Sequence, residues 1–509
     1  MVVPPAQSAG GCAAVARGVT RPGTVALPAV SDAREFRLRI AKGLVALGPA
    51  VPSLGRLFAA AGHEISLVGG VVRDMALDRG SYDLDLTTDA HPDDTERLLA
   101  GWADATWDIG KAFGTIGARR GDETFEVTTY RAEAYDRTSR KPAVSYGTDL
   151  VDDLRRRDFT VNAMAIRFAG GGDQPEFVDP FDGLADLAAG VLRTPASPAE
   201  SFGDDPLRMM RAARFAAQLQ FTVDPAARAA MTELADRLSI VSVERVQAEL
   251  SKLLLSPSPR RGLEVLVETG LAAQMLPELP TLQLEADEHH RHKDVYEHSL
   301  TVLEQAIELE PRLGNGPDLT NRLAALLHDI GKPRTRRFED GGRVSFHHHE
   351  VVGAKMARKR LTALRYSNEV VDDVSTLVEL HLRFHGYGSG EWTDSAVRRY
   401  VRDAGDQLAR LHVLTRADCT TRNRRKAAAL SRTYDQLEDR IAALREQEQL
   451  DSLRPDLSGD EIMAVLGIPP GPAVGRAYRF LLESRIENGP LGPDAAREAL
   501  LAWWTEQAG

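Results

Sequence analysis

The fold of the first part of the chain is decided by LVGGVVRD (residues 67–74), followed closely by YDLDLT (residues 82–87). Residues 64–68 favour a short strand, the two glycines form a turn, and a helix begins after the turn. The start of a helix presents free backbone N–H groups, and such groups bind phosphate well. Gly69 and Gly70 are therefore candidate phosphate-binding residues, and Arg73, about one helical turn further on, adds a fixed positive charge.

Two carboxylates follow this turn. Asp83 and Asp85 are two residues apart in a predicted strand, so their side chains lie on the same face of it. Glu126, on a later predicted strand at residues 125–130, offers a third carboxylate. Mg²⁺ commonly takes a few protein carboxylates together with substrate phosphates. Each feature alone is usually only a turn or a solvated strand, but their close order favours a nucleotide-binding site with a magnesium ion.

Two groups of arginines follow. The first is RRRD (residues 155–158), which is either an anion-binding patch or a solvated charge run. The members of the second group lie three residues apart: Asp205, Arg208, Arg211 and Arg214. On a helix, this spacing would place neighbouring members close together on one side. Aspartate accepts a hydrogen bond from a base amino group and arginine donates in a rigid fork, so this set suits recognition of a nucleotide base. Asp205-Pro206 also has the form of a helix N-cap followed by proline.

Taken in order, these motifs resemble those of the class II tRNA nucleotidyltransferase and bacterial poly(A) polymerase family, within the polymerase-beta-like superfamily. DLRRRDFTVNA (residues 153–163) is similar to the second motif of the family, and GDDPLRMMRAARF (residues 203–215) to its nucleotide-reading motif. The resemblance covers residues 65 to 425. It implies the catalytic residues Asp83, Asp85 and Glu126, and the NTP-binding residues Gly69, Gly70, Arg73, Arg157, Asp205, Arg208, Arg211 and Arg214. The family usually has Glu-Asp where this chain has Asp204-Asp205, a departure that concerns only the role of residue 204.

The second half of the chain carries an ordered set of histidines and aspartates. His328-Asp329 follows an apolar helix predicted at residues 323–327. The arrangement resembles the HD phosphohydrolase domain, which implies the metal ligands His298, His328, Asp329 and Asp418, with His349 and His381 available for a second metal. Imidazole and carboxylate together suit a transition metal better than Mg²⁺, and such a metal lowers the pKa of bound water for phosphoester cleavage. His347 and His348 are interpreted as surface residues.

The predicted fold class is α+β, with a small polymerase-beta-like nucleotidyltransferase α/β head followed by an extended all-α body that contains an HD domain. The predicted division is a disordered N-terminal tail (1–33), the head (34–195), a helical neck for nucleotide reading and RNA binding (196–280), the HD domain (285–426) and a helical C-terminal tail (427–509).

Composition limits the classes of protein that fit. The chain has 509 residues and a formal net charge of −11, so overall charge does not hold it to nucleic acid, although local basic clusters can. Such clusters occur at residues 334–337, 358–360 and 422–426. Two cysteines exclude a disulfide framework and fit a cytoplasmic protein. No apolar run is long enough for a transmembrane helix, so no membrane contact is expected.

The function expected from these residues is template-independent addition or repair of the 3′-terminal CCA of tRNA from CTP and ATP. The expected cofactors are Mg²⁺ in the head and a transition metal in the HD site, and the expected partners are the tRNA 3′ end and the two nucleotides, with no protein partner inferred. Three alternatives stay open: a poly(A) polymerase, an HD phosphohydrolase with a nucleotide-sensing head, and a non-catalytic RNA-binding protein. The intact Asp83-x-Asp85 disfavours the second alternative, and the two intact sets of metal ligands disfavour the third.

Overall fold

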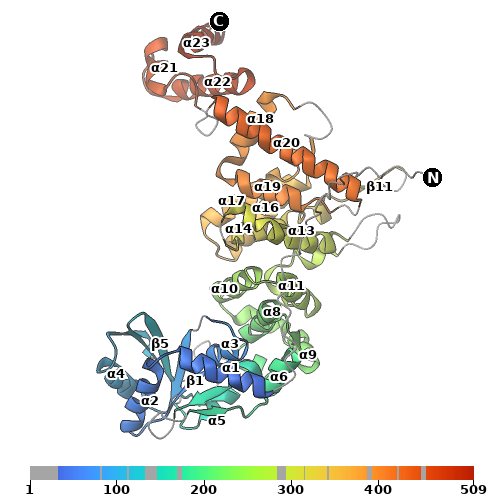
Figure 1. Cartoon of the computed structure of the whole chain (residues 1–509). Helices are drawn as coiled ribbons and strands as arrows, with labels where there is room; N and C mark the ends of the chain where they lie inside the picture. The colour runs from blue at the N-terminus through green and yellow to red at the C-terminus, as the bar shows by residue number, and fades with distance from the viewer. Residues whose placement is uncertain are drawn as a thin grey trace, which may run out of the picture.

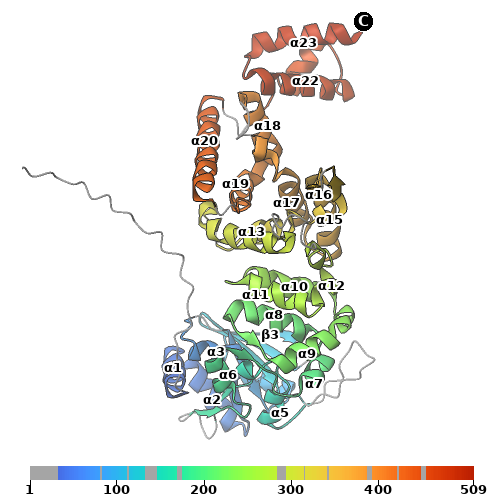
Figure 2. The same ribbon diagram turned by 90° about the vertical axis from the view of Figure 1, so that its right-hand side faces the viewer.

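The computed structural model describes residues 33–508 apart from 81–82, 112–113, 132–145, 169–174, 284–293, 315, 341–342, 387–391, 421–422 and 449–453. The molecule is elongated, with an α/β head at one end and a helical body that extends away from it (Figures 1 and 2). This arrangement confirms the predicted α+β class. The predicted N-terminal tail lies, up to residue 32, outside the described residues.

The head is built on a seven-stranded sheet with the order β3-β4-β5-β2-β1-β6-β7. Its strands are β1 (Ile65–Val68), β2 (Leu84–Thr88), β3 (Ala105–Gly110), β4 (Thr115–Arg120), β5 (Glu123–Thr129), β6 (Ala165–Arg167) and β7 (Glu176–Val178). β1 pairs antiparallel with β2 and β6, whereas β2 pairs in parallel with β5. β1, β2 and β5 are the three strands that the sequence predicts. The four residues of β1 are all buried, so the glycine turn follows a fixed strand.

Helices and buried apolar side chains hold this sheet in place. The head helices are α1 (Ala33–Ala46), α2 (Ala50–Ala60), α3 (Gly70–Ala76), α4 (Pro92–Ala100), α5 (Leu150–Arg155) and α6 (Gly183–Ala189). α1 packs against α3 and α6, and α2 packs against β1. Phe58, Leu67 and Phe125 are fully buried between them. Burial of such side chains contributes roughly 1.5–3 kcal/mol each, which keeps the strand ends at fixed positions.

The neck (residues 198–282) joins the head to the body. Its helices are α7 (Pro198–Asp204), α8 (Leu207–Leu219), α9 (Pro225–Glu233), α10 (Val243–Leu254), α11 (Pro259–Glu268) and α12 (Leu271–Met275). α8 packs against α10 and α11. Gly262 makes the α8–α11 contact close, because a Cβ atom there would lie 2.5 Å from the carbonyl oxygen of Ala213. The short parallel pair β8 (Val191–Leu192) and β9 (Thr222–Val223) ties the end of the head to the neck.

The HD body (residues 295–448) is helical except for one hairpin. Its helices are α13 (Val295–Leu309), α14 (Leu319–Leu327), α15 (Lys332–Thr335), α16 (His349–Ala363), α17 (Asn368–Leu380), α18 (Asp394–Ala404), α19 (Leu408–Ala417) and α20 (Arg424–Glu448). The hairpin of β10 (Arg337–Glu339) and β11 (Arg343–Ser345) departs from the all-α expectation. Buried Arg322 fixes the body on the neck, because it bonds to Glu310 at 2.7 Å and to the carbonyl oxygens of Leu254 and Ser256 at 2.6 and 2.8 Å.

The last three helices form a separate unit with its own small core: α21 (Gly459–Leu466), α22 (Pro472–Asn488) and α23 (Pro493–Ala508). Buried Arg398 of α18 donates to the carbonyl oxygen of Ile486 at 3.0 Å and joins this unit to the body. Residue 426, predicted to end the HD domain, lies within α20, which packs on α18 and α19. Within the described ranges no single helix is long and apolar enough to cross a membrane, and α1 and α2 satisfy that criterion only together, with a bend of 87° between them.

Candidate active sites

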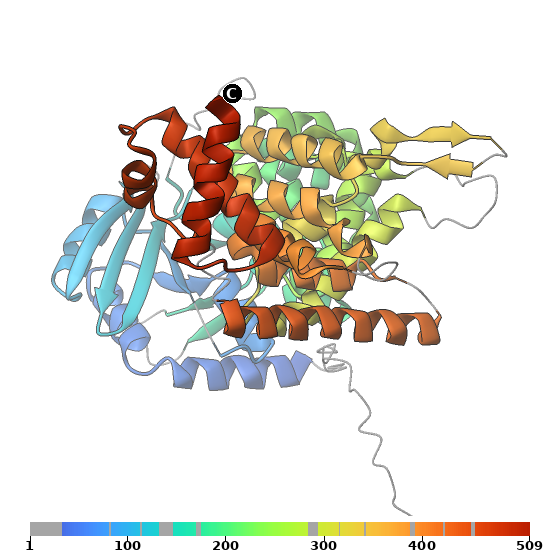
Figure 3. The same cartoon turned by 90° about the horizontal axis from the view of Figure 1, so that it is seen from above.

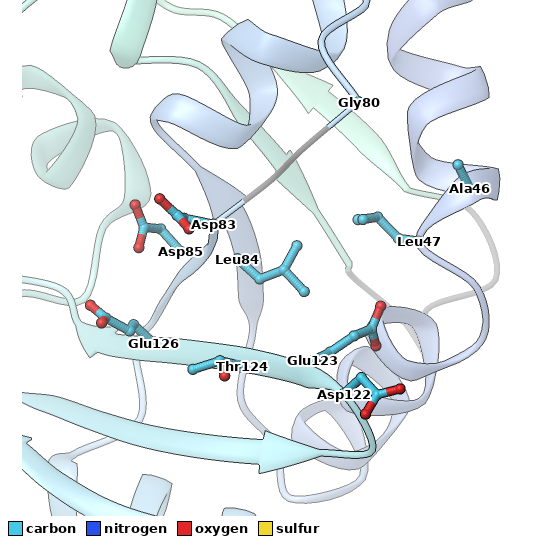
Figure 4. Close-up of a pocket in the computed structure, with 10 residues that line it drawn as sticks. All are labelled: Ala46, Leu47, Gly80, Asp83, Leu84, Asp85, Asp122, Glu123, Thr124 and Glu126. Carbon is cyan, nitrogen blue, oxygen red and sulfur yellow. The ribbon is translucent and has the colours of Figure 1, made fainter. Parts of the chain in front are cut away.

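Three carboxylates of the head meet at one pocket. Asp83 directly precedes β2, Asp85 is on it, and Glu126 is on the neighbouring strand β5, where it is the register partner of Asp85. All three line a pocket of about 650 Å³. Figure 4 shows their side chains on one side of this pocket, while Asp122 and Glu123 lie on the other. The structure thus brings together the three residues expected to be catalytic.

The charges around Asp85 suit a cation. Burial raises the pKa of Asp85 to about 6, Glu126 and Asp83 add to this effect, and Arg157 opposes it. Like charges held together in a partly dry pocket disfavour ionisation, and a divalent cation between them removes that penalty. An oxygen-only donor set of this kind fits a hard ion such as Mg²⁺.

The glycine turn lies beside these carboxylates and requires glycine. Gly69 has φ = 77°, a conformation that side chains disfavour. A Cβ atom on Gly69 would also lie 2.9 Å from Nη1 of Arg157. Arg157 donates to Asp153 at 3.3 Å, and its buried Nε has no hydrogen-bond partner within the described residues. The turn therefore leaves room for Arg157 to reach a ligand.

Arg73 occupies a different position from the one the sequence suggests. Its guanidinium is buried, donates to Asn162 Oδ1 at 2.6 Å, and bonds to both carboxylate oxygens of Asp74 at 3.0 and 2.8 Å. Its charge is therefore balanced by Asp74, next to the turn at Gly70.

Helix α8 is connected to the head by a chain of charged side chains. Asn162 donates to Asp158 at 3.0 Å, and Arg211 bonds to the other oxygen of Asp158 at 2.7 Å. Glu249 of α10 lies 3.8 Å from Arg211 and accepts a hydrogen bond from Arg214 at 2.6 Å. Burial would raise the pKa of Asp158, but Arg211 and Asn162 outweigh it and lower the pKa to about 2. Two of the predicted base-contacting arginines are thus held by fixed carboxylates.

The other two members of the predicted set lie near the start of α8. Asp205 uses Oδ1 to accept the N–H of Leu207 at 3.1 Å, while its Oδ2 lies 3.0 Å from Arg245 of α10. Arg208 donates to the hydroxyl of Ser201 at 2.9 Å and to the carbonyl oxygen of Arg156. The sequence predicts Asp205 as the N-cap, but α8 begins at Leu207 with Pro206 in the cap position. Asp205 nevertheless accepts from the first N–H of α8, and this contact occupies only one carboxylate oxygen.

The HD body contains a second cluster of possible metal ligands. One group consists of His298, His328 and Asp418, and the other of Asp329, His349 and His381. His298 Nε2 lies 3.2 Å from His328 Nε2 and 3.0 Å from Asp418. Asp329 connects the two groups, because one of its oxygens is 3.3 Å from His328 and the other is 3.1 Å from His349. All six residues expected from the HD resemblance therefore converge.

The imidazoles are held in a form that binds metal. His328, His349 and His381 each have Nδ1 within 2.6 to 2.8 Å of the backbone carbonyl three residues earlier, which leaves Nε2 facing the cluster. In the described part of the chain, Nε2 of His381 is buried without a hydrogen-bond partner, while Nε2 of His349 lies 3.1 Å from Asp329. Burial and nearby His328 lower the pKa of His381 to about 3, so it is neutral. Several imidazole nitrogens gathered beside two carboxylates fit a transition metal.

The sequence did not indicate a role for some residues of these sites. Asn162 lies in the second motif without a suggested role, and Glu249 and Arg245 are lone polar residues on α10. Only the four-residue spacing of Arg245 and Glu249 on one helix hinted that these two side chains share a face. His347 and His348 are exposed and lie outside the ligand groups, as expected.

Three family models match successive parts of the chain. Residues 65–193 match a family model described as the poly A polymerase head domain, residues 220–282 match the probable RNA and SrmB-binding site of polymerase A, and residues 295–423 match the HD domain. The A-adding tRNA nucleotidyltransferase of Deinococcus radiodurans is 36% identical over 87% of this chain and 96% of its own length. The CC-adding tRNA nucleotidyltransferase of Thermus thermophilus is 33% identical over 86% and 93%.

Other relatives match more narrowly. The CCA-adding enzyme of Streptococcus gordonii is 41% identical over 45% of this chain, and the match spans about half (55%) of that relative. Among solved structures, the Bacillus stearothermophilus CCA-adding enzyme in complex with CTP has a TM-score of 0.64 at 24% identity, covering 91% of this chain and 99% of that one. A head with clustered carboxylates, a helical neck and an HD body define a nucleotidyltransferase of the poly A polymerase type. Within that class, the chain belongs to the tRNA nucleotidyltransferase family.

Proposed function

We propose that this protein adds or repairs the 3′-terminal CCA of tRNA, using CTP and ATP. The observation that carries the proposal is the convergence of Asp83, Asp85 and Glu126 beside the Gly69 turn and Arg157. Family membership supports tRNA as the acceptor. The two relatives matched over nearly their whole length are an A-adding and a CC-adding enzyme. The main competing proposal is therefore that this protein adds only CC or only the final A.

The residues of the head define how transfer would proceed. Asp83, Asp85 and Glu126 would hold Mg²⁺, which supplies charge neutralisation and orients the 3′-hydroxyl for in-line displacement at the α-phosphorus. A bond forms between the ribose 3′-oxygen and the α-phosphorus, and the bond to the β-phosphate oxygen breaks to release pyrophosphate. The guanidinium of Arg157 lies next to Gly69, and its Nε has no hydrogen-bond partner within the described residues, which favours the triphosphate at the turn. Arg73 lies against the same turn at Gly70 and bonds to Asn162.

The start of α8 is the proposed base-recognition surface. Asp205 and Arg208 supply an acceptor and a donor there, and Arg211 and Arg214 are braced by Asp158 and Glu249. A tRNA transcript ending at its discriminator base and an unstructured RNA, each supplied with CTP and ATP, test the proposal. Extension of the tRNA by three nucleotides supports CCA addition, whereas long adenosine tracts on both RNAs would instead support a poly(A) polymerase.

A second activity is proposed for the HD body, namely metal-dependent hydrolysis of phosphoesters. The supporting observation is the pair of ligand groups bridged by Asp329, with the buried Nε2 of His381 lacking a hydrogen-bond partner within the described residues. A bound transition metal would supply an activated water molecule. Metal content by mass spectrometry and hydrolysis of 2′,3′-cyclic AMP test it, and His381→Ala should lower both.

A further inference from the structure

The amide side chain of Asn162 lies between the glycine turn of the head and the helix that carries the base-recognition residues. Its Oδ1 accepts a hydrogen bond from Arg73 at 2.6 Å, and its Nδ2 donates to Asp158 at 3.0 Å. All three side chains are buried. Arg73 touches the glycine turn, because a Cβ atom on Gly70 would be 3.5 Å from its Nη2. Asn162 therefore connects the turn to Asp158.

The orientation of this amide is dictated by its two neighbours. The arginine only donates hydrogen bonds. Against the effect of burial, Arg211 and Asn162 lower the pKa of Asp158 to about 2, so this carboxylate is ionised and only accepts them. An amide satisfies both neighbours, whereas a carboxylate of the same shape at residue 162 would face Asp158 with a like charge. The position therefore requires asparagine rather than aspartate.

The contacts continue from Asp158 into the neck. Arg211 of α8 bonds to Asp158 at 2.7 Å. Glu249 of α10 lies 3.8 Å from Arg211 and accepts a hydrogen bond from Arg214 at 2.6 Å. Donors and acceptors thus alternate from the glycine turn, through Asn162, to the base-recognition helix. A buried polar network of this kind is rigid when its members are paired, so the turn and α8 are held at a fixed separation.

The ring of Phe215 gives this junction an apolar centre. Phe215 is on α8, and its side chain is buried. The guanidinium carbon lies 5.3 Å from the ring centroid for Arg73, 5.5 Å for Arg211 and 4.0 Å for Arg214. Cations at such distances are attracted to an aromatic face. Arg73 of the head therefore contacts α8 directly, in addition to the connection through Asn162.

The separation matters because of where the head lies. Figure 3 shows the sheet of the head to one side of the neck and HD helices. A tilt of the head about the junction would therefore move the glycine turn relative to α8. A nucleotide that uses the turn for its triphosphate and α8 for its base spans both, and it binds well only when the two are in register. A ligand that uses one of them alone is insensitive to this separation.

We propose that Asn162 is a positioning residue that keeps the triphosphate turn in register with the base-recognition residues of α8. The inference rests on the proposed function, which assigns the triphosphate to the turn and the base to α8. Loss of Asn162 should weaken ligands that use both parts, namely CTP and ATP. It should spare ligands that use one part, namely inorganic triphosphate and cytidine. Damage to either part would weaken these small ligands as well, so the comparison separates positioning from a structural role.

The experiment measures binding to the full-length protein with Mg²⁺ and without RNA, so that no transfer takes place. Labelled CTP is equilibrated with the protein by dialysis, and ATP, UTP, cytidine and inorganic triphosphate are added as competitors. Asn162→Asp should weaken CTP and ATP by about tenfold, the usual effect of leaving buried polar groups without their partners. Cytidine and triphosphate should change by less than about twofold, because each part keeps its own contacts. UTP lacks the amine that Asp205 accepts, so its affinity should also be unchanged, and the preference for CTP over UTP should fall.

Two further variants test the same register. Asn162→Ala removes both hydrogen bonds without adding a charge, and Phe215→Leu keeps an apolar side chain but removes the ring from the guanidinium groups. Both should act in the same direction as Asn162→Asp. Asn162→Ala should also reduce the effect of Asp205→Ala on CTP affinity, because a base that is out of register gains little from Asp205. Asn488→Asp is the matched control, since it makes the same chemical change at an exposed residue of α22 and should leave every affinity unchanged.

The outcomes separate the inference from the proposed function. If the wild-type protein binds CTP and ATP no more tightly than inorganic triphosphate, the base is not recognised and both are wrong. If the wild-type protein prefers CTP and ATP but Asn162→Asp keeps the wild-type affinities, or weakens the small ligands as much as CTP, the proposed function stands and the positioning role is overturned. Melting curves verify that each variant is folded at the temperature of the assay.

Discussion

The carboxylate of Asp205 is shared between two partners: one oxygen accepts the backbone N–H of Leu207 at 3.1 Å, and the other lies 3.0 Å from Arg245. The first contact stabilises the start of α8, and the second fixes the outward-facing oxygen. The Asp205 carboxylate can therefore both stabilise the start of α8 and contact a nucleotide base. A pair of substitutions separates them.

Asp205→Asn keeps an acceptor for the helix start, whereas Asp205→Ala removes it. We expect both variants to misincorporate UTP and GTP about tenfold more often, because the acceptor presented to the base is lost or replaced by a donor. Only Asp205→Ala should also lower the free energy of unfolding, by about 1 kcal/mol. Primer-extension assays and melting curves measure the two effects. If selectivity is unchanged in both variants, Asp205 has a capping role only.

Asp83→Asn and Asp85→Asn should abolish nucleotide addition while leaving the protein folded. Loss of a carboxylate ligand removes charge stabilisation of the transferring phosphate, which is worth several kcal/mol or about a thousandfold in rate. Asp122→Asn is the matched control, since Asp122 lines the same pocket on its other side. Single-turnover rates with Mg²⁺ measure the loss. Near wild-type rates in the first two variants would disprove the metal assignment.

Asp158 predicts a specific pH dependence of stability. Because Arg211 and Asn162 lower its folded pKa to about 2 from an ordinary value of 3.8, the carboxylate adds about 2 kcal/mol of stability above pH 4. That contribution is lost as the pH falls through the folded pKa. Asp158→Asn should therefore be less stable than wild type at pH 7, and the difference should shrink between pH 5 and pH 3. Chemical denaturation at each pH measures it.

Exposed Asp152 on α5 provides the control, because Asp152→Asn removes the same charge without a buried partner. It should show little difference from wild type at any pH. A constant difference between Asp158→Asn and wild type across this range would mean that the Asp158–Arg211 contact adds no charge-dependent stability.

The predicted sites fall on separate parts of the chain and should act independently. The double variant His328→Ala/Asp329→Ala removes a ligand from each group of the HD centre and should eliminate phosphoester hydrolysis while nucleotide addition continues. Distant sites without shared partners usually contribute additively. Loss of a buried metal can also unfold the body, so thermal melting must accompany the assays. A folded variant that loses addition as completely as hydrolysis would contradict the two-site account.

The sequence predicts the parts of this molecule that are encoded as ordered motifs. The strand, glycine turn and Asp-x-Asp define the head, and the spaced histidines and aspartates define the HD centre, because each motif keeps its chemistry within a short stretch. The partners of α8 are not predictable in this way. Glu249 and Arg245 are single polar residues on a different helix, and only the packing of α8 on α10 brings them to Arg214 and Asp205.

The hairpin β10–β11 was missed for another reason. Its strands are three residues long and rich in charge, so they lack the apolar alternation that predicts a strand. The Asp-Gly-Gly sequence at residues 340–342 is nevertheless a typical hairpin turn signal. The role of Arg73 also depended on folding, because only the buried contacts with Asp74 and Asn162 show that its charge is already balanced.

Addition of CCA is tested by sequencing tRNA 3′ ends after incubation with the wild-type protein and Mg²⁺. Transcripts ending at the discriminator base, after one added C and after two added Cs are each supplied with CTP, with ATP, and with both. We expect CC from CTP alone on the transcript ending at the discriminator base, A from ATP alone only on the transcript ending in CC, and complete CCA on all three with both nucleotides. Addition restricted to CC or to the final A, adenosine tracts, or no addition to any transcript would contradict it.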